Sequence, residues 1–138
     1  MIMKRIAISF ALLAAVVCMA AARDVRRCSS SSTGNLTLLA DSIDFRSDLT
    51  RLYGQLQGRP HTSGRIDRIY ISVDGVEKDA TDIDGVDFKR WFQWEDGGLI
   101  PVEIDLPPLK PGSVVRVYAV SPRGAATWVV KVGKSTGK

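Results

Sequence analysis

Cysteine and histidine are scarce in this 138-residue chain, which contains two cysteines, Cys18 and Cys28, and a single histidine, His61. Because Cys18 lies within an N-terminal apolar run, Cys28 is left without an intrachain disulfide partner if that run is removed. His61 lies in a loop near Ser63 and Asp67, but the sequence lacks a motif that presents a nucleophile on a sharp turn. These shortages predict a non-enzymatic protein without a cofactor.

Helical periodicity is also missing after the first 22 residues. Instead, alternating or β-branched segments recur between turn signals such as Asp74-Gly75. The predicted strands are residues 36–45, 50–57, 66–73, 76–81, 99–106, 114–120 and 126–132, and the aromatic-rich residues 88–94 are either an eighth strand or an irregular crossing. Seven to eight short strands in this length predict an all-β fold, an immunoglobulin-like antiparallel β-sandwich.

The last third of the chain carries two short structural motifs. Leu109-Lys110-Pro111-Gly112-Ser113 and the later segment 117–124, with sequence VYAVSPRG, resemble the penultimate strand and turn of fibronectin type III and related immunoglobulin-like domains. The resemblance covers residues 109–132 only. It implies a sandwich and transfers no function.

The N-terminal segment has the layout of a signal peptide. Lys4-Arg5 precedes an apolar run from Ile6 to Ala22, which ends in small residues. Residues 1–22 are therefore predicted to direct export to the periplasm or the extracellular space. An uncleaved membrane anchor and lipidation at Cys18 are the two alternatives, and only these would attach the protein to a membrane.

The rest of the chain divides by composition. Residues 23–35 are Ser-rich and predict a flexible linker that carries Cys28 as a free thiol. Residues 36–132 predict the folded domain, and the polar residues 133–138 predict a disordered tail.

The net charge of +4 does not belong to the predicted domain. Residues 1–35 and 133–138 together carry seven basic residues and one acidic residue, whereas residues 36–132 carry twelve basic and fourteen acidic residues. A nucleic-acid-binding domain would need its basic residues on the folded surface. We therefore expect no nucleic acid partner.

A cluster of aspartates suggests calcium as an alternative. Five aspartates fall within residues 74–87, and Asp82, Asp84 and Asp87 would be the ligands if calcium bound there. The bidentate glutamate of a helix-loop-helix calcium site is missing. Aspartates in turns commonly hydrogen-bond nearby backbone instead.

Aromatic residues offer a second alternative, a carbohydrate-binding module. Trp91 and Trp94 lie an odd number of positions apart, so a regular strand would expose one of them to a glycan. Trp128 shares its strand face with Ala126 and Val130 and is predicted to belong to the core.

The preferred binding surface joins two predicted strands. Arg68 and Tyr70 alternate outward on one, Arg116 and Tyr118 do so on the other, and the family-like topology makes these strands neighbours. Tyrosine and arginine are enriched in the hot spots of protein interfaces. Ordinary cross-strand pairing is the competing interpretation. We expect a bacterial secreted or periplasmic protein that binds a protein partner or serves as an envelope-associated structural module.

Overall fold

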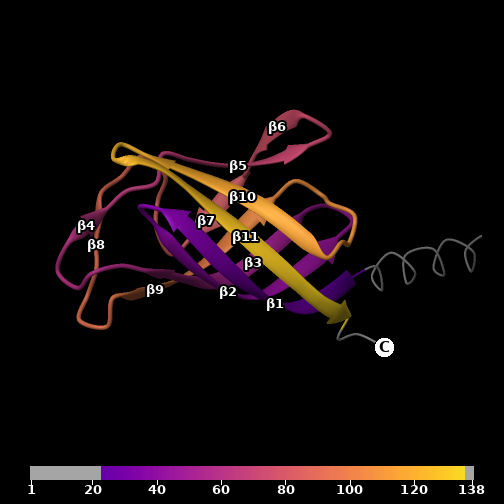
Figure 1. The fold of residues 1–138 in the computed structure, drawn as a ribbon, viewed down its shortest axis with the longest axis horizontal. Coiled ribbons are helices and arrows are strands. Elements are labelled where there is room, and N and C mark those ends of the chain that lie inside the picture. Colours follow the sequence, from indigo (N-terminus) through magenta and orange to yellow (C-terminus); the bar gives the residue numbers. More distant parts are fainter. Residues whose placement is uncertain (1–22, 136–138) are drawn as a thin grey trace, which may run out of the picture.

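The fold is seen in a computed structural model that describes residues 23–135, so the expected signal segment with Cys18 lies outside the described residues. Eleven strands make up this range, and no helix in it has the length and hydropathy to cross a membrane (Figure 1). The strands are β1 (Arg23–Gly34), β2 (Thr37–Arg46), β3 (Thr50–Gln57), β4 (Ser63–Gly64), β5 (Arg68–Val73), β6 (Val76–Asp79), β7 (Asp82–Asp84), β8 (Phe92–Gln93), β9 (Leu99–Leu106), β10 (Val114–Ser121) and β11 (Gly124–Ser135).

Nine strands form one antiparallel sheet in the order β6-β5-β10-β11-β1-β2-β3-β9-β7, and β4 pairs with β8 in a separate ribbon. The large sheet curls into a half-barrel, so that β10 and β11 lie across from β3 and β9 (Figure 1). The expected all-β antiparallel class is confirmed. One continuous sheet of nine strands is observed, whereas an immunoglobulin-like sandwich has seven to nine strands divided between two sheets.

Each of the eight predicted segments overlaps a strand, and residues 50–57 and 99–106 have the predicted bounds, but only Phe92–Gln93 of the segment 88–94 form a strand. Three strands were not predicted: β1, β4 and β7. Because β4 and β7 have only two and three residues, they are too short to show a periodic pattern.

β1 corrects the prediction of a flexible linker at residues 23–35. It is an interior strand that pairs with β11 along most of its length and with β2 over Arg23–Arg27. Cys28 is half-buried against the core, so it is not a thiol in a flexible tail. Pairing to neighbours on both sides outweighs the low strand preference of a serine run, because strand formation depends on tertiary context.

Serine side chains continue the contact where the backbone pairing of β1 with β2 ends. The Ser30 hydroxyl donates to the Leu38 carbonyl at 2.6 Å and accepts from the Ala40 N–H at 2.8 Å. The Leu38 N–H donates to the Ser32 hydroxyl at 3.0 Å. The two strands thus separate while the polar backbone groups of β2 keep their partners, as buried backbone groups must.

The C-terminal strand is longer than expected. β11 continues to Ser135, where the sequence predicted a disordered tail from residue 133. Gly133 packs close to the backbone of Arg27, because a Cβ at Gly133 would lie 3.0 Å from the Arg27 carbonyl oxygen. Pairing with β1 therefore extends the strand beyond the predicted domain boundary, and residues 136–138 lie outside the described residues.

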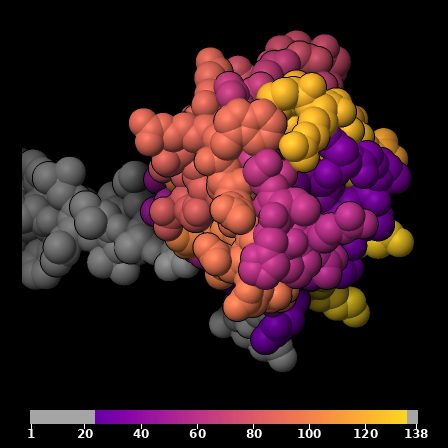
Figure 2. All heavy atoms as spheres, turned by 90° about the vertical axis from the view of Figure 1, so that its left-hand side faces the viewer, coloured from indigo at the N-terminus to yellow at the C-terminus, as the bar shows by residue number. Residues whose placement is uncertain are grey.

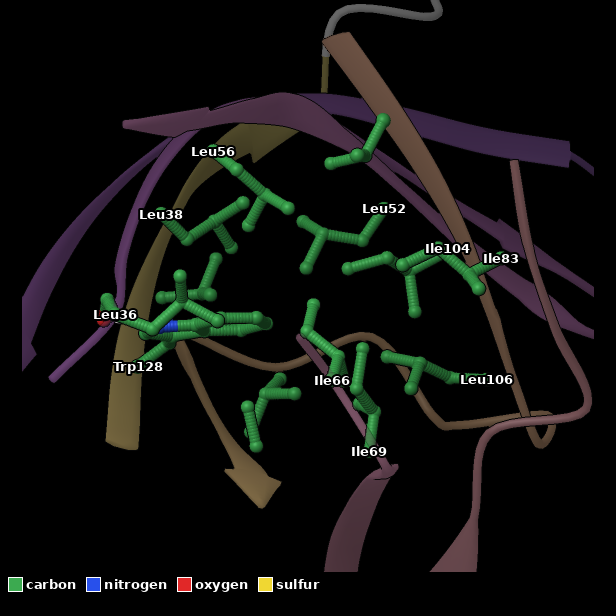
Figure 3. Packing of buried hydrophobic residues seen from close by; sticks show 14 of the residues in the cluster. Leu36, Leu38, Leu52, Leu56, Ile66, Ile69, Ile83, Ile104, Leu106 and Trp128 are labelled. Atoms are coloured by element: carbon green, nitrogen blue, oxygen red, sulfur yellow. Dashed lines mark hydrogen bonds between the residues drawn. The ribbon is translucent and has the colours of Figure 1, made fainter. Parts of the chain in front are cut away.

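The hydrophobic core fills the space inside the curled sheet (Figure 3). Trp128 on β11 is fully buried, as predicted, and its indole N–H donates to the Leu36 carbonyl at 3.1 Å. Leu52 and Ile104 approach from the opposite half of the sheet. Burial of these apolar side chains on both halves holds the sheet in its curled shape.

The two edge strands of the large sheet, β6 and β7, are short and charged. β6 contains Glu77, Lys78 and Asp79, all exposed, and β7 has exposed aspartates on either side of Ile83. Short charged edges discourage pairing with strands of other chains.

Candidate functional site

The six residues expected to bind a partner lie in two places. Four occupy the outer face of β5 and β10, and we call them the Arg/Tyr surface. The other two belong to the end of the molecule that carries the β4–β8 ribbon. The first group is Arg68, Tyr70, Arg116 and Tyr118, and the second is Trp91 and Trp94.

The two tyrosines of the Arg/Tyr surface stack on each other. β5 and β10 are neighbours, as expected, with Tyr70 directly opposite Tyr118. The ring centroids lie 5.1 Å apart and the ring planes differ by 19°. Because Ile69 and Ile71 point into the core, the alternation of the strand directs Tyr70 outward. The result is a half-buried aromatic pair with one side open to solvent.

Arg68 completes the stack and is held by β6. Its guanidinium carbon lies 4.1 Å from the centre of the Tyr70 ring. Nε donates to Asp79 at 2.6 Å and Nη2 to Glu77 at 3.2 Å, and the bond to Asp79 is the main cause of the raised pKa of Arg68. The Asp74-Gly75 turn, with φ angles of 52° and 78°, brings β6 beside β5 as a two-residue hairpin turn does.

The row of paired residues that begins with Tyr70 and Tyr118 continues with threonines on the next two strands. Thr127 of β11 lies opposite Tyr118 on one side and opposite Thr33 of β1 on the other. Arg116 is exposed and, among the described residues, has no carboxylate within 4.0 Å. The outer face therefore combines aromatic, hydroxyl and guanidinium groups.

The two tryptophans have opposite environments. Trp91 is 52% exposed and Trp94 only 4%, which confirms that one of the pair faces solvent. Trp94 is thus unsuited as an exposed ligand platform, which corrects its place among the binding residues. Its ring packs edge-on against Phe92, and Gly58 lies so close that a Cβ there would be 2.1 Å from Trp94 Cε2.

A pocket of about 150 Å³ lies at this end of the molecule, and we call it the end pocket. Figure 2 shows the surface around it, where the magenta segment near residue 60, the salmon segment near residue 90 and the yellow β10–β11 turn meet. Its lining includes Arg59, Arg65, Arg123 and Trp91. Because Asn35 and Leu36 also line it, four segments that are distant in sequence supply one pocket.

Two arginines flank the exposed tryptophan. The guanidinium carbons of Arg65 and Arg123 lie 5.7 Å and 5.3 Å from the Trp91 ring centre. Arg123 donates to the Ser63 carbonyl at 3.1 Å, and Arg65 Nε donates to Asp67 at 2.6 Å. The local sequence of Arg123 gives no sign of this role, because 60 positions separate it from Ser63 and only the fold brings them together.

His61 and Asp67, the histidine and the acid that could have formed a catalytic pair, each have a different partner in the structure. His61 is exposed, and its Nε2 lies 3.0 Å from Asp96 Oδ1. Asp67, the acid considered as its partner, pairs with Arg65 instead. His61 also has a φ of 65°, which places it in a turn of the loop before β4.

The aspartates considered for calcium do not form a ligand set. Asp82 and Asp84 lie on β7 opposite Asp105 and Glu103 of β9. Arg51 offsets part of this negative charge, because its Nε lies 2.7 Å from Asp105. Within residues 23–135, Asp87 among them, no three His, Cys, Asp or Glu side chains are grouped so that they could hold a metal ion.

A wider groove of about 570 Å³ crosses the outer face of β2, β3 and β9. Its lining includes three carboxylates, those of Asp41, Asp84 and Glu103, beside Tyr53. The sequence did not predict this groove. The register of β2 against β3 shifts between Ala40 and Ser42, and that bulge sets the position of Asp41.

No family model matches the chain, and comparisons with curated proteins and with solved structures also find no match.

Proposed function

We propose that this is an exported, non-enzymatic bacterial protein that binds another protein through the Arg/Tyr surface. The observation that carries the proposal is the stack of Arg68, Tyr70 and Tyr118 on an open sheet face. The curled antiparallel sheet is the scaffold of this surface, and its all-β fold is compatible with the sandwich that the immunoglobulin-like likeness of residues 109–132, the region of the β10–β11 hairpin, implies. The segment 1–22 supports export.

The surface has the properties of a pre-organised interface. Asp79 and Glu77 hold Arg68, and Arg68 in turn packs over Tyr70. Side chains that are already ordered lose little conformational entropy on binding, which leaves more of the contact energy for affinity. Tyrosine is also enriched in the binding loops of antibodies, with arginine at their hot spots.

Affinity capture from the cell envelope of the source organism tests the proposal. The purified protein and a Tyr70→Ala/Tyr118→Ala variant serve as baits, and mass spectrometry identifies what each retains. Tyr53→Ala is the matched control, because Tyr53 is the only other tyrosine in the sequence and lies on β3, in the other half of the sheet.

We expect a protein that the wild type and Tyr53→Ala retain and that the folded double variant loses. Retention of the same protein by all three baits would refute the assignment of the surface. Thermal unfolding of each bait verifies that the variants fold, so that a lost partner reports binding.

A further inference from the structure

The end pocket is lined by positive charge. Arg59, Arg65 and Arg123 contribute to the lining, and within the described part of the chain no aspartate or glutamate does. Three guanidinium groups line this one pocket, and among the described residues the only carboxylate paired with any of them is that of Asp67, so the electrostatic potential there is positive. The lining therefore favours a negatively charged ligand group.

Two of these arginines have no ionic partner of their own. Arg59 and Arg123 have no carboxylate within 4.0 Å in the described range, and Arg65 uses only its Nε to contact Asp67. Guanidinium groups recognise carboxylate, phosphate and sulfate oxygens through paired N–H donors. Arg123 is already positioned, because it donates to the Ser63 carbonyl.

The neutral part of the lining fits a sugar ring. Trp91 is half exposed and lines the pocket beside the amide groups of Asn35 and Gln57 and the hydroxyl of Thr62. Because Arg65 and Arg123 already lie over its ring, a sugar ring would contact the part of the indole that the two guanidinium groups leave open. An aromatic face covers the apolar side of a ring, while amides and hydroxyls bond its hydroxyl groups. The volume of about 150 Å³ has room for several water molecules, and so for one charged group and the adjoining ring edge.

We propose that the end pocket binds the oxyanion of an acidic sugar, a phosphate, sulfate or carboxylate group, with the sugar ring against Trp91. Arg59 and Arg123 contact the oxyanion. This site lies apart from the Arg/Tyr surface, and neither proposal depends on the other.

Calorimetric titration with one sugar in four forms tests the proposal. Glucose 6-phosphate, glucose 6-sulfate and glucuronate carry the three oxyanions, and glucose carries none. We expect at least one acidic form to bind, glucose to show no measurable binding, and inorganic phosphate or sulfate to bind more weakly than the matching sugar. The tightest of the three identifies the oxyanion.

Variants separate the pocket from general charge effects. Arg123→Gln is expected to weaken binding about tenfold or more, as the loss of a charge-assisted contact does. Trp91→Ala is expected to weaken the binding of the acidic sugar but not the binding of the inorganic ion. Lys131→Gln removes one exposed charge from β11 outside the pocket lining and is expected to change nothing.

Three results would overturn the proposal. The first is the absence of binding by all three acidic sugars, and the second is equal affinity in the folded Arg123→Gln variant. The third is equal binding of inorganic ion and acidic sugar, which would show that the sugar ring makes no contact. Unfolding curves of all variants establish that the fold is intact.

Discussion

Replacing Ser30 by alanine removes the side chain that makes two hydrogen bonds between β1 and β2. The Ala40 N–H loses its acceptor at 2.8 Å, and the Leu38 carbonyl loses its shorter donor at 2.6 Å. A polar group left without a partner costs about 1–3 kcal/mol. The site is partly buried and Leu38 keeps the Ser32 hydroxyl at 3.3 Å, so we expect a total loss of about 2 kcal/mol.

Urea unfolding followed by tryptophan fluorescence measures this loss, because Trp128 is fully buried in the folded state. With a slope of about 2 kcal/mol per molar urea, the midpoint should fall by about 1 M. Ser31→Ala is the matched control, since Ser31 is the exposed neighbour on the same strand. Its change should stay within about 0.5 kcal/mol. Ser30→Thr keeps the hydroxyl and should retain most of the stability.

Equal midpoints for Ser30→Ala and Ser31→Ala would refute the reasoning. The result would mean that water replaces the hydroxyl at no cost, and that β1 and β2 are joined by backbone pairing and core contacts alone. An unchanged slope is required for the comparison, because a changed slope indicates a different unfolded or native state.

Gly58→Ala should lower the free energy of unfolding by about 1–3 kcal/mol, because the added Cβ would lie 2.1 Å from the Trp94 ring. In the control Gly97→Ala the added Cβ would have no neighbouring atom within 4 Å, so its free energy of unfolding should equal that of the wild type. Trp128→Phe should cost about 2 kcal/mol in urea unfolding, since it removes a buried hydrogen bond and leaves a void, and an unchanged midpoint would contradict this. Burial raises the pKa of Cys28 to about 11, so iodoacetamide should alkylate the folded protein far more slowly at pH 8 than the protein in urea. Because the folded pKa exceeds the unfolded value of 9.0, the Cys28 thiol should contribute fully to the free energy of unfolding below pH 9 and lose that contribution as the pH rises to about 11. In Cys28→Ala the free energy of unfolding should therefore fall less between pH 9 and pH 11 than in the wild type.

The local sequence predicted those parts of the fold that depend on neighbouring residues. Alternation over residues 50–57 and 99–106 located two strands with their ends, and Asp74-Gly75 located a hairpin turn with the positive φ angles that such a turn needs.

The candidate sites also combine features that follow from the local sequence with features that require the tertiary structure. The outward direction of Tyr70 and Tyr118 follows from strand alternation, and the likeness to sandwich domains placed their strands together. The stack with Arg68, and its anchoring by Asp79, required the β6 hairpin to fold back. Nothing in the local sequence of Arg123 indicated that it would meet Trp91.

The sequence by itself determined the all-β class, most strand positions, the core position of Trp128 and the exposure of one of the two neighbouring tryptophans. These features follow from side-chain alternation and turn chemistry within a few residues. The tertiary structure decided that the serine run is an interior strand, that one curled sheet encloses the core, and that arginines from distant segments share a pocket. The reason is physical: a strand completes its hydrogen bonds with partners that are far away in sequence, so a weakly strand-forming segment forms a strand here because β2 and β11 lie on either side of it.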